Sequence, residues 1–148
     1  MPDSYNGNEL TTLRLDMFAN GYHPVPVSGP ECPCKSPGKQ PLMRAWQTVC
    51  KTAAPPLIRK WTSTERNSTN TGILAGEVAG IDIDVPVPEL ADELEDLARE
   101  MLGETPLWRV GRPPKRLAVY RIDKPFGKLM TPEPVSYTHL TLPTILRV

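Results

Sequence analysis

The sequence predicts an α/β domain in which a mixed, largely antiparallel sheet is flanked by helices. Two stretches repeat apolar residues at the spacing of a helix, and several short apolar runs of strand length are interspersed with them. This alternation is typical of helices packed in a layer on a sheet.

The first half of the chain contains two expected helices. Residues 8–20 place apolar side chains near one helical face, and Gly21 is a stop signal. Residues 22–27 read as a short extended segment, and residues 29–40, GPECPCKSPGKQ, as an irregular polar loop. A short helix is expected over residues 56–63.

The second half contains the strands and the most secure helix. Residues 71–75 and 80–85 are two apolar strands around a glycine-containing turn, a pattern that favours a hairpin. Residues 88–102 begin with a proline, repeat leucine and alanine at helical spacing and stop at a glycine. Residues 107–110 and 116–122 are expected to be strands.

The stretch GIDIDVP carries two acids, Asp82 and Asp84, within an apolar run. On a strand, residues two apart point to the same face, so the acids project together and the apolar residues project to the opposite side. Neighbouring carboxylates repel unless a cation neutralises them, and Mg²⁺ commonly binds one or two carboxylates with water and phosphates. The alternative is a pair of solvated acids at a strand end.

The charges balance, with 17 basic and 17 acidic residues, but they are segregated. Residues 89–104 are acidic, whereas residues 109–128 carry seven basic residues and one acid, Asp123. A basic block after a carboxylate pair is suited to binding phosphates, and it is equally compatible with an ordinary solvated surface.

The cysteines and the absence of long apolar runs indicate the compartment. Three cysteines form no secreted disulfide framework, no apolar run has the length of a bilayer span, and no signal segment opens the chain. We therefore expect a cytoplasmic protein with no membrane partner. Cys32, Cys34 and Cys50 could form a zinc site with His23, but the spacing favours a loop with free thiols.

The C-terminal residues 135–144 read VSYTHLTLPT. This string resembles the translation of a transposon-end adapter used in sequencing libraries, and ten consecutive matches favour that origin over a genuine strand rich in threonine and leucine. We expect residues 135–148 to be a non-native tail, so His139 is not a candidate ligand. The expected natural part, residues 1–134, has the size of one domain with a modest core.

Five segments occur in a characteristic order between residues 21 and 128: GYHPVPV, GKQPLMRAW, LIRKW, NTGILAGEVAGIDIDV and WRVGRPPKRLAVYRIDKPF. In this order they resemble the N-terminal bifunctional DNA primase/polymerase domain of the archaeo-eukaryotic primase superfamily, which occurs in phage and plasmid replication proteins. The resemblance implies an incomplete primase-polymerase-like domain.

The resemblance also implies nucleotidyl transfer on a DNA template with nucleoside triphosphates as substrates. Asp82 and Asp84 match the acids that hold Mg²⁺ or Mn²⁺ in this family. Basic residues near the metals would bind phosphates of the nucleotide or of the template, and the candidates are Arg112, Lys115, Arg116 and, as a weaker one, Lys39. A helicase encoded downstream is a further expected partner.

The chain departs from the family pattern at two points. Relatives place a histidine where this chain has Arg116, and they use a third carboxylate for which Asp123 lies too early in the chain. The third acid is therefore expected after residue 134, and the chain as it stands could lack activity. Two alternatives stay open: a catalytically inactive module that binds nucleic acid, and a glycosyltransferase fragment that holds a nucleotide-sugar through D-x-D.

Overall fold

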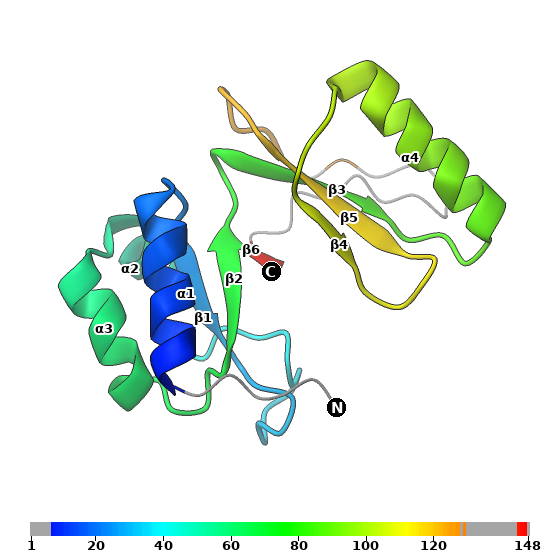
Figure 1. Ribbon diagram of the computed structural model, residues 1–148. Helices are drawn as coiled ribbons and strands as arrows, with labels where there is room; N and C mark the ends of the chain where they lie inside the picture. The colour runs from blue at the N-terminus through cyan, green and yellow to red at the C-terminus, as the bar shows by residue number, and fades with distance from the viewer. Residues whose placement is uncertain (1–6, 128, 130–144, 148) are drawn as a thin grey trace. The chain divides into compact units, whose positions relative to one another are not determined.

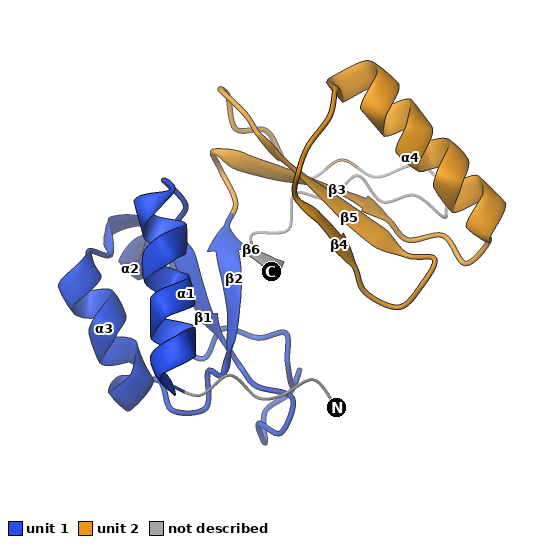
Figure 2. Ribbon diagram, in the orientation of Figure 1, with its two compact units in different colours: residues 1–74, 147–148 blue, residues 75–146 orange. Residues whose placement is uncertain are grey.

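The computed structural model describes residues 7–127, 129 and 145–147 of the chain. Within this part, four helices and two three-stranded sheets form an α/β arrangement with antiparallel pairing, which confirms the predicted class (Figure 1). The chain divides into two compact units, residues 1–74 with 147–148 and residues 75–146 (Figure 2). The expected boundary after Pro134, His139 and residues 135–144 lie outside the described residues.

Unit 1 contains three helices and one sheet. Its helices are α1 (Gly7–Ala19), α2 (Trp46–Thr52) and α3 (Pro55–Thr64), and its strands are β1 (Pro24–Val27) and β2 (Asn70–Leu74). The sheet has the order β1-β2-β6, and of β6 (Ile145–Arg147) only Arg147 belongs to this unit. β6 falls in the expected tail, whose origin stays a prediction. No helix in the described part of the chain is long and apolar enough to cross a membrane.

The core of unit 1 forms where α1 packs on α3. Helix α1 buries Leu10, Arg14 and Met17, which follow one another at intervals of about one turn, and α3 buries Ile58 and Trp61. The burial of Leu10, Met17, Ile58 and Trp61 agrees with the apolar positions expected from the sequence, but Leu57, also expected to pack, is exposed. The burial of Arg14 was not expected.

Arg14 connects α1 to the start of β2 through its guanidinium group. Its Nε donates to Thr71 Oγ1 at 2.7 Å, and its Nη2 donates to the carbonyls of Ser68 and Asn70 at 2.8 and 2.9 Å. The guanidinium carbon also lies 5.9 Å from the centroid of the Trp61 ring. Burial lowers the pKa of Arg14 to about 10, so the group stays charged at neutral pH.

The polar loop after β1 is ordered by hydrogen bonds that close it on itself. Ser28 N–H donates to the Gln40 carbonyl at 2.8 Å, and Gln40 N–H donates to Ser28 Oγ at 3.1 Å. Gly38 N–H donates to the Gly29 carbonyl at 2.9 Å. Gly38 has a φ of 71°, a conformation that a residue with a side chain rarely adopts.

Unit 2 contains one helix and one sheet. The elements are β3 (Val78–Ile83), α4 (Pro88–Leu102), β4 (Trp108–Val110) and β5 (Arg116–Arg121), and the sheet has the order β3-β5-β4 with both pairings antiparallel. Helix α4 lies along one face of this sheet (Figure 1). Ile83, Val85 and Ala91 form the fully buried cluster between them, and burying each of the larger side chains contributes about 1.5–3 kcal/mol.

The structure confirms most expected elements and corrects one pairing. The predicted helix over residues 88–102 is α4, and the strands expected over 107–110 and 116–122 are β4 and β5. The predicted hairpin is wrong, because β2 pairs with β1 whereas β3 pairs with β5. Each strand thus completes its hydrogen-bond ladder with a strand that is distant in the sequence.

Helix α2 was not predicted. It has only seven residues, begins after Ala45 with no side-chain cap, and buries only Cys50. A helix this short shows neither a capping signal nor a clear apolar period.

Candidate metal and phosphate site

The two acids lie at the end of β3, on the side of the sheet that faces away from α4. Asp82 is in the strand and Asp84 follows directly after it. Ile83 and Val85 are fully buried against α4, whereas both acids are partly exposed. This alternation agrees with the prediction that the acids share one face.

The register of the sheet decides which basic residues share that face. Asp82 lies opposite Leu117 of β5, and Leu117 lies opposite Arg109 of β4. Directly opposed residues of an antiparallel sheet point to the same side. Arg109 therefore shares the face of Asp82. Arg116 lies opposite Ile83 and shares the face that packs against α4.

Asp84 is paired with Lys115. The Lys115 Nζ lies 2.6 Å from Asp84 Oδ1, and the side chains are 44% and 39% exposed. An ion pair this exposed is worth only about 0.2–1 kcal/mol, so it can be exchanged for another interaction at small cost. Lys115 thus supplies one cation at the position where a metal would bind the same carboxylate.

A small pocket adjoins this ion pair. It has a volume of about 360 Å³ and is lined by Pro86, Arg112, Pro113, Pro114 and Lys115. Two of the predicted phosphate-binding residues, Arg112 and Lys115, therefore meet at one pocket next to Asp84. The prolines leave few backbone N–H groups there, so the charged side chains provide the main polar contacts.

Arg116, the third candidate for phosphate binding, does not share the face of Asp82. Its Nη1 pairs with Glu95, its Nη2 lies 2.9 Å from Asp92 Oδ1, and its Nε donates to the Pro114 carbonyl at 3.0 Å. The bond to Glu95 raises the pKa of Arg116. These contacts link α4 to β5, and the expectation that Arg116 binds phosphate in place of the family's histidine stays a prediction.

Glu95 joins Arg116 to a second arginine. Its Oε1 accepts from Arg99 Nε at 3.1 Å and from Arg99 Nη2 at 2.7 Å, and the Arg99 guanidinium carbon lies 4.8 Å from the centroid of the Trp108 ring. Burial alone would raise the pKa of Glu95, but the hydrogen bonds from Arg116 and Arg99 lower it overall. The spacing of Glu95 and Arg99, four residues apart in a helix, was the sequence signal for half of this network.

The donor set fits a hard divalent cation. Asp82 and Asp84 provide the one or two protein carboxylates that Mg²⁺ commonly takes, and their exposure leaves room for water and phosphate oxygens. No group of three or more metal-binding side chains occurs within the described residues. Asp123, the acid considered as a third ligand, is exposed after β5. Lys39 lies in unit 1, on the exposed loop after β1, and its role stays a prediction.

The cysteines form a thiol pair and a separate buried thiol. All three are free, and the described residues contain no cluster that would complete a zinc site around them. Cys34 N–H donates to the Cys32 carbonyl at 2.8 Å. Burial would raise the pKa of the Cys34 thiol, but hydrogen bonds from Cys32, Ser28 and the backbone lower it overall.

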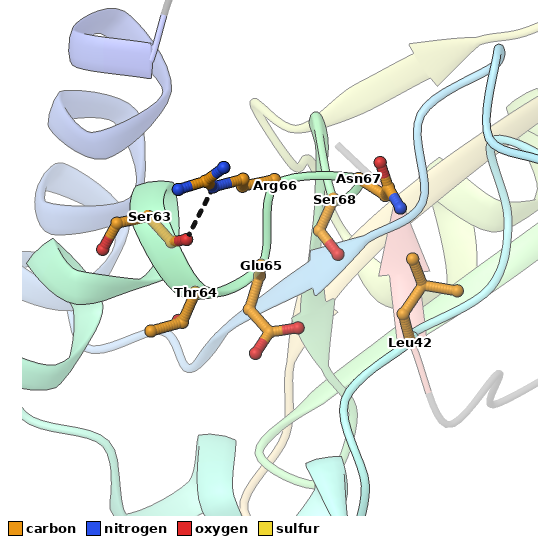
Figure 3. A pocket seen from close by; sticks show the side chains of 7 residues that line it. All are labelled: Leu42, Ser63, Thr64, Glu65, Arg66, Asn67 and Ser68. Atoms are coloured by element: carbon orange, nitrogen blue, oxygen red, sulfur yellow. Dashed lines mark hydrogen bonds between the residues drawn. The ribbon is translucent and has the colours of Figure 1, made fainter.

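A second pocket lies in unit 1, at the end of α3 (Figure 3). Its volume is about 360 Å³, and its lining residues include one acid, Glu65, and one base, Arg66. The Arg66 Nε donates to the Ser63 carbonyl at 3.2 Å. The pocket has no carboxylate pair, so it does not offer the chemistry found at Asp82 and Asp84.

Comparisons with curated proteins and with solved structures find no match. A family model described as "Bifunctional DNA primase/polymerase, N-terminal" matches residues 14–140, which is most of the chain. The matched range extends past Pro134, and the boundary expected there stays a prediction. Nucleotidyl transfer, with DNA and nucleotides as substrates, is the general activity that this family implies. The chain belongs to the bifunctional DNA primase/polymerase N-terminal family.

Proposed function

We propose that the intact protein is a metal-dependent DNA primase/polymerase of a phage, plasmid or prophage replication system. The observation that carries the proposal is the placement of two partly exposed acids, Asp82 and Asp84, on one face at the end of β3, in a chain that belongs to the primase/polymerase family. The expected partners are a DNA template, nucleoside triphosphates and a helicase.

Asp82 and Asp84 would hold Mg²⁺ or Mn²⁺. When bound, such ions stabilise the charge on the attacking and leaving oxygens during phosphoryl transfer. The remaining contribution of the protein is to position and neutralise the phosphates. Arg112 and Lys115 are suited to this role because they line the pocket next to Asp84.

Lys115 has a specific part in this proposal. In the structure its ammonium group neutralises Asp84. A cation on Asp84 would repel the ammonium group, which would then move to a triphosphate oxygen. Because the ion pair is exposed and weak, this exchange costs little free energy.

Primer synthesis by the intact protein tests the proposal. Synthesis on single-stranded DNA should require Mg²⁺ or Mn²⁺, and Asp82→Ala and Asp84→Ala should abolish it while leaving the circular dichroism spectrum unchanged. Asp123→Ala is a matched control, because this exposed acid lies outside the proposed site. Undiminished synthesis by either β3 variant would refute the assignment.

The second candidate is a nucleic-acid-binding module without catalysis. Two observations favour this candidate. The described residues offer only two carboxylates at the site, and Arg116 is paired with two acids of α4. We propose that the third carboxylate lies after Pro134. Binding of single-stranded DNA without any metal-dependent binding of nucleoside triphosphate would favour the module. The family match leaves the glycosyltransferase alternative without support.

A further inference from the structure

We propose that Arg109 is a phosphate-binding residue of the Asp82 and Asp84 site and takes the role that the sequence suggested for Arg116. The inference rests on the proposed function, because it assigns a ligand contact within the same site. The ligand chemistry is a phosphate group, carried either by a nucleoside triphosphate or by the template backbone.

Arg109 lies on the same face of the sheet as Asp82. Across the sheet, Asp82, Leu117 and Arg109 form one row, because they are directly opposed in the two pairings β3-β5 and β5-β4. Trp108, the neighbour of Arg109 in β4, packs with the cluster under α4. Since side chains alternate along a strand, Arg109 must point away from α4, toward the side of the acids.

The distance across the sheet is within the range of a long side chain. Arg109 and Asp82 are separated by two strand spacings, which places their backbones about 10 Å apart. Leu117 lies between them in the row and is buried. A phosphate group near Asp82 would shorten the distance that the Arg109 side chain has to span. The long arginine side chain can cover the rest of this distance, and its planar fork suits two phosphate oxygens at once.

The Arg109 side chain is directed along β4 toward Gly111. A Cβ atom placed on Gly111 would lie 3.9 Å from Arg109 Nη2. The guanidinium group therefore extends along the strand toward residue 111, next to the turn that carries Arg112 and Lys115. The three cationic side chains of Arg109, Arg112 and Lys115 thus lie at the same end of the sheet as Asp84. The Lys115 Nζ lies 2.6 Å from Asp84 Oδ1.

Arg109 and Arg116 differ in their ion pairs within the described residues. Arg116 is held by two acids of α4. Arg109 has no ion pair within the described residues, because each of the five ion pairs found there involves other side chains. Its side chain is only partly exposed. A partly desolvated arginine that has no carboxylate partner among the described residues is well placed to gain from an anionic ligand.

Binding measurements on the 148-residue chain test the inference. The affinity for dATP with Mn²⁺ and the affinity for a single-stranded oligonucleotide would be measured by calorimetry for the wild type, Arg109→Gln and Arg109→Lys. We expect Arg109→Gln to lose about 10-fold to 100-fold in affinity for its phosphate ligand, the usual value of a hydrogen bond to a charged group. Arg109→Lys should restore part of this loss.

Arg121→Gln is the matched control. Arg121 lies opposite Val78 at the far end of β3, on the same face and exposed, about 14 Å along the strand from Asp82. It should stay within about 2-fold of the wild type for dATP. A loss confined to dATP identifies the nucleotide as the ligand, and a loss confined to the oligonucleotide identifies the template backbone. Unchanged affinity for both in Arg109→Gln, or an equal loss in Arg121→Gln, would overturn the inference.

Asp84→Asn separates this inference from the proposed function. If the wild type binds dATP with Mn²⁺, Asp84→Asn loses the binding and Arg109→Gln keeps it, only the role of Arg109 is wrong. If the 148-residue wild type binds neither dATP with Mn²⁺ nor the oligonucleotide, the role of Arg109 fails, whereas the proposed function of the intact protein is judged by its primer synthesis. The Mn²⁺ affinity without nucleotide, measured by electron paramagnetic resonance, should be unchanged in Arg109→Gln.

Discussion

The ammonium group of Lys115 lies 2.6 Å from a carboxylate oxygen of Asp84, one of the two acids that would hold a metal. Both side chains are about 40% exposed, so the interaction is readily exchanged. Lys115 and a metal ion would therefore compete for Asp84. A ligand that carries both a metal and a phosphate would end this competition, because the metal would bind Asp84 and the phosphate would bind Lys115.

Replacing Lys115 by methionine should affect the two ligands in opposite directions. The affinity for Mn²⁺ should rise by up to about 5-fold, because an exposed ion pair worth at most about 1 kcal/mol no longer competes for Asp84. The affinity for dATP should fall. Lys124→Met, which alters an exposed lysine after β5, should change neither. A lower Mn²⁺ affinity in Lys115→Met would contradict the competition.

Replacing Arg116 by methionine should destabilise the fold without weakening nucleotide binding. The change leaves Glu95 and Asp92 without this partner, and a hydrogen bond to a charged group contributes about 1.5–3 kcal/mol. We expect the free energy of unfolding in urea to fall by about 2 kcal/mol. The affinity for dATP should stay within about 2-fold. A loss of dATP affinity with unchanged stability would show that Arg116 contributes to nucleotide binding.

The contribution of Glu95 to stability should disappear in acid. Its pKa is lower in the folded chain than in the unfolded chain, because Arg116 and Arg99 stabilise the carboxylate. The stabilisation is therefore fully present above the unfolded pKa of about 4.3 and is lost as the pH falls through the folded value. The difference in urea midpoint between the wild type and Glu95→Gln should be largest near neutral pH. A difference that stays constant down to about pH 3 would show that the charge of Glu95 is not responsible.

Arg14 should be among the most sensitive positions in unit 1. Arg14→Met removes donors from Thr71 Oγ1 and from the carbonyls of Ser68 and Asn70, all near the start of β2. Since a buried group left without a partner costs about 1–3 kcal/mol, the free energy of unfolding should fall by about 3 kcal/mol or more. Arg59→Met, at an exposed position of α3, should have little effect. Equal stability of the two variants would mean that water replaces the guanidinium group.

The cysteines should differ in reactivity toward iodoacetamide. Hydrogen bonds lower the pKa of Cys34, which is partly exposed, whereas burial raises the pKa of Cys50 to about 12. Since the thiolate is the reactive form, Cys34 should be alkylated first in the native chain and Cys50 only after denaturant is added. Peptide mass spectrometry over time would measure the order. Early labelling of Cys50 would show that the core of unit 1 opens readily.

The sequence predicted the features that depend on neighbours along the chain. The apolar period of α4 and its flanking Pro88 and Gly103 defined the helix, and the alternation around Asp82 and Asp84 defined two faces of β3. These patterns are local, because a helix or a strand determines which residues share a side within about two turns or a few residues.

Only the tertiary structure decided which strands pair and in which register. A hairpin of β2 and β3 was reasonable from the glycine turn, but their partners are β1 and β5. Arg109 and Arg116 look equivalent in a basic block, yet the register places one with the acids and the other under α4. The physical reason is that a shift of one residue in register reverses the face of every side chain, and the contacts that select the register come from residues far apart in the sequence.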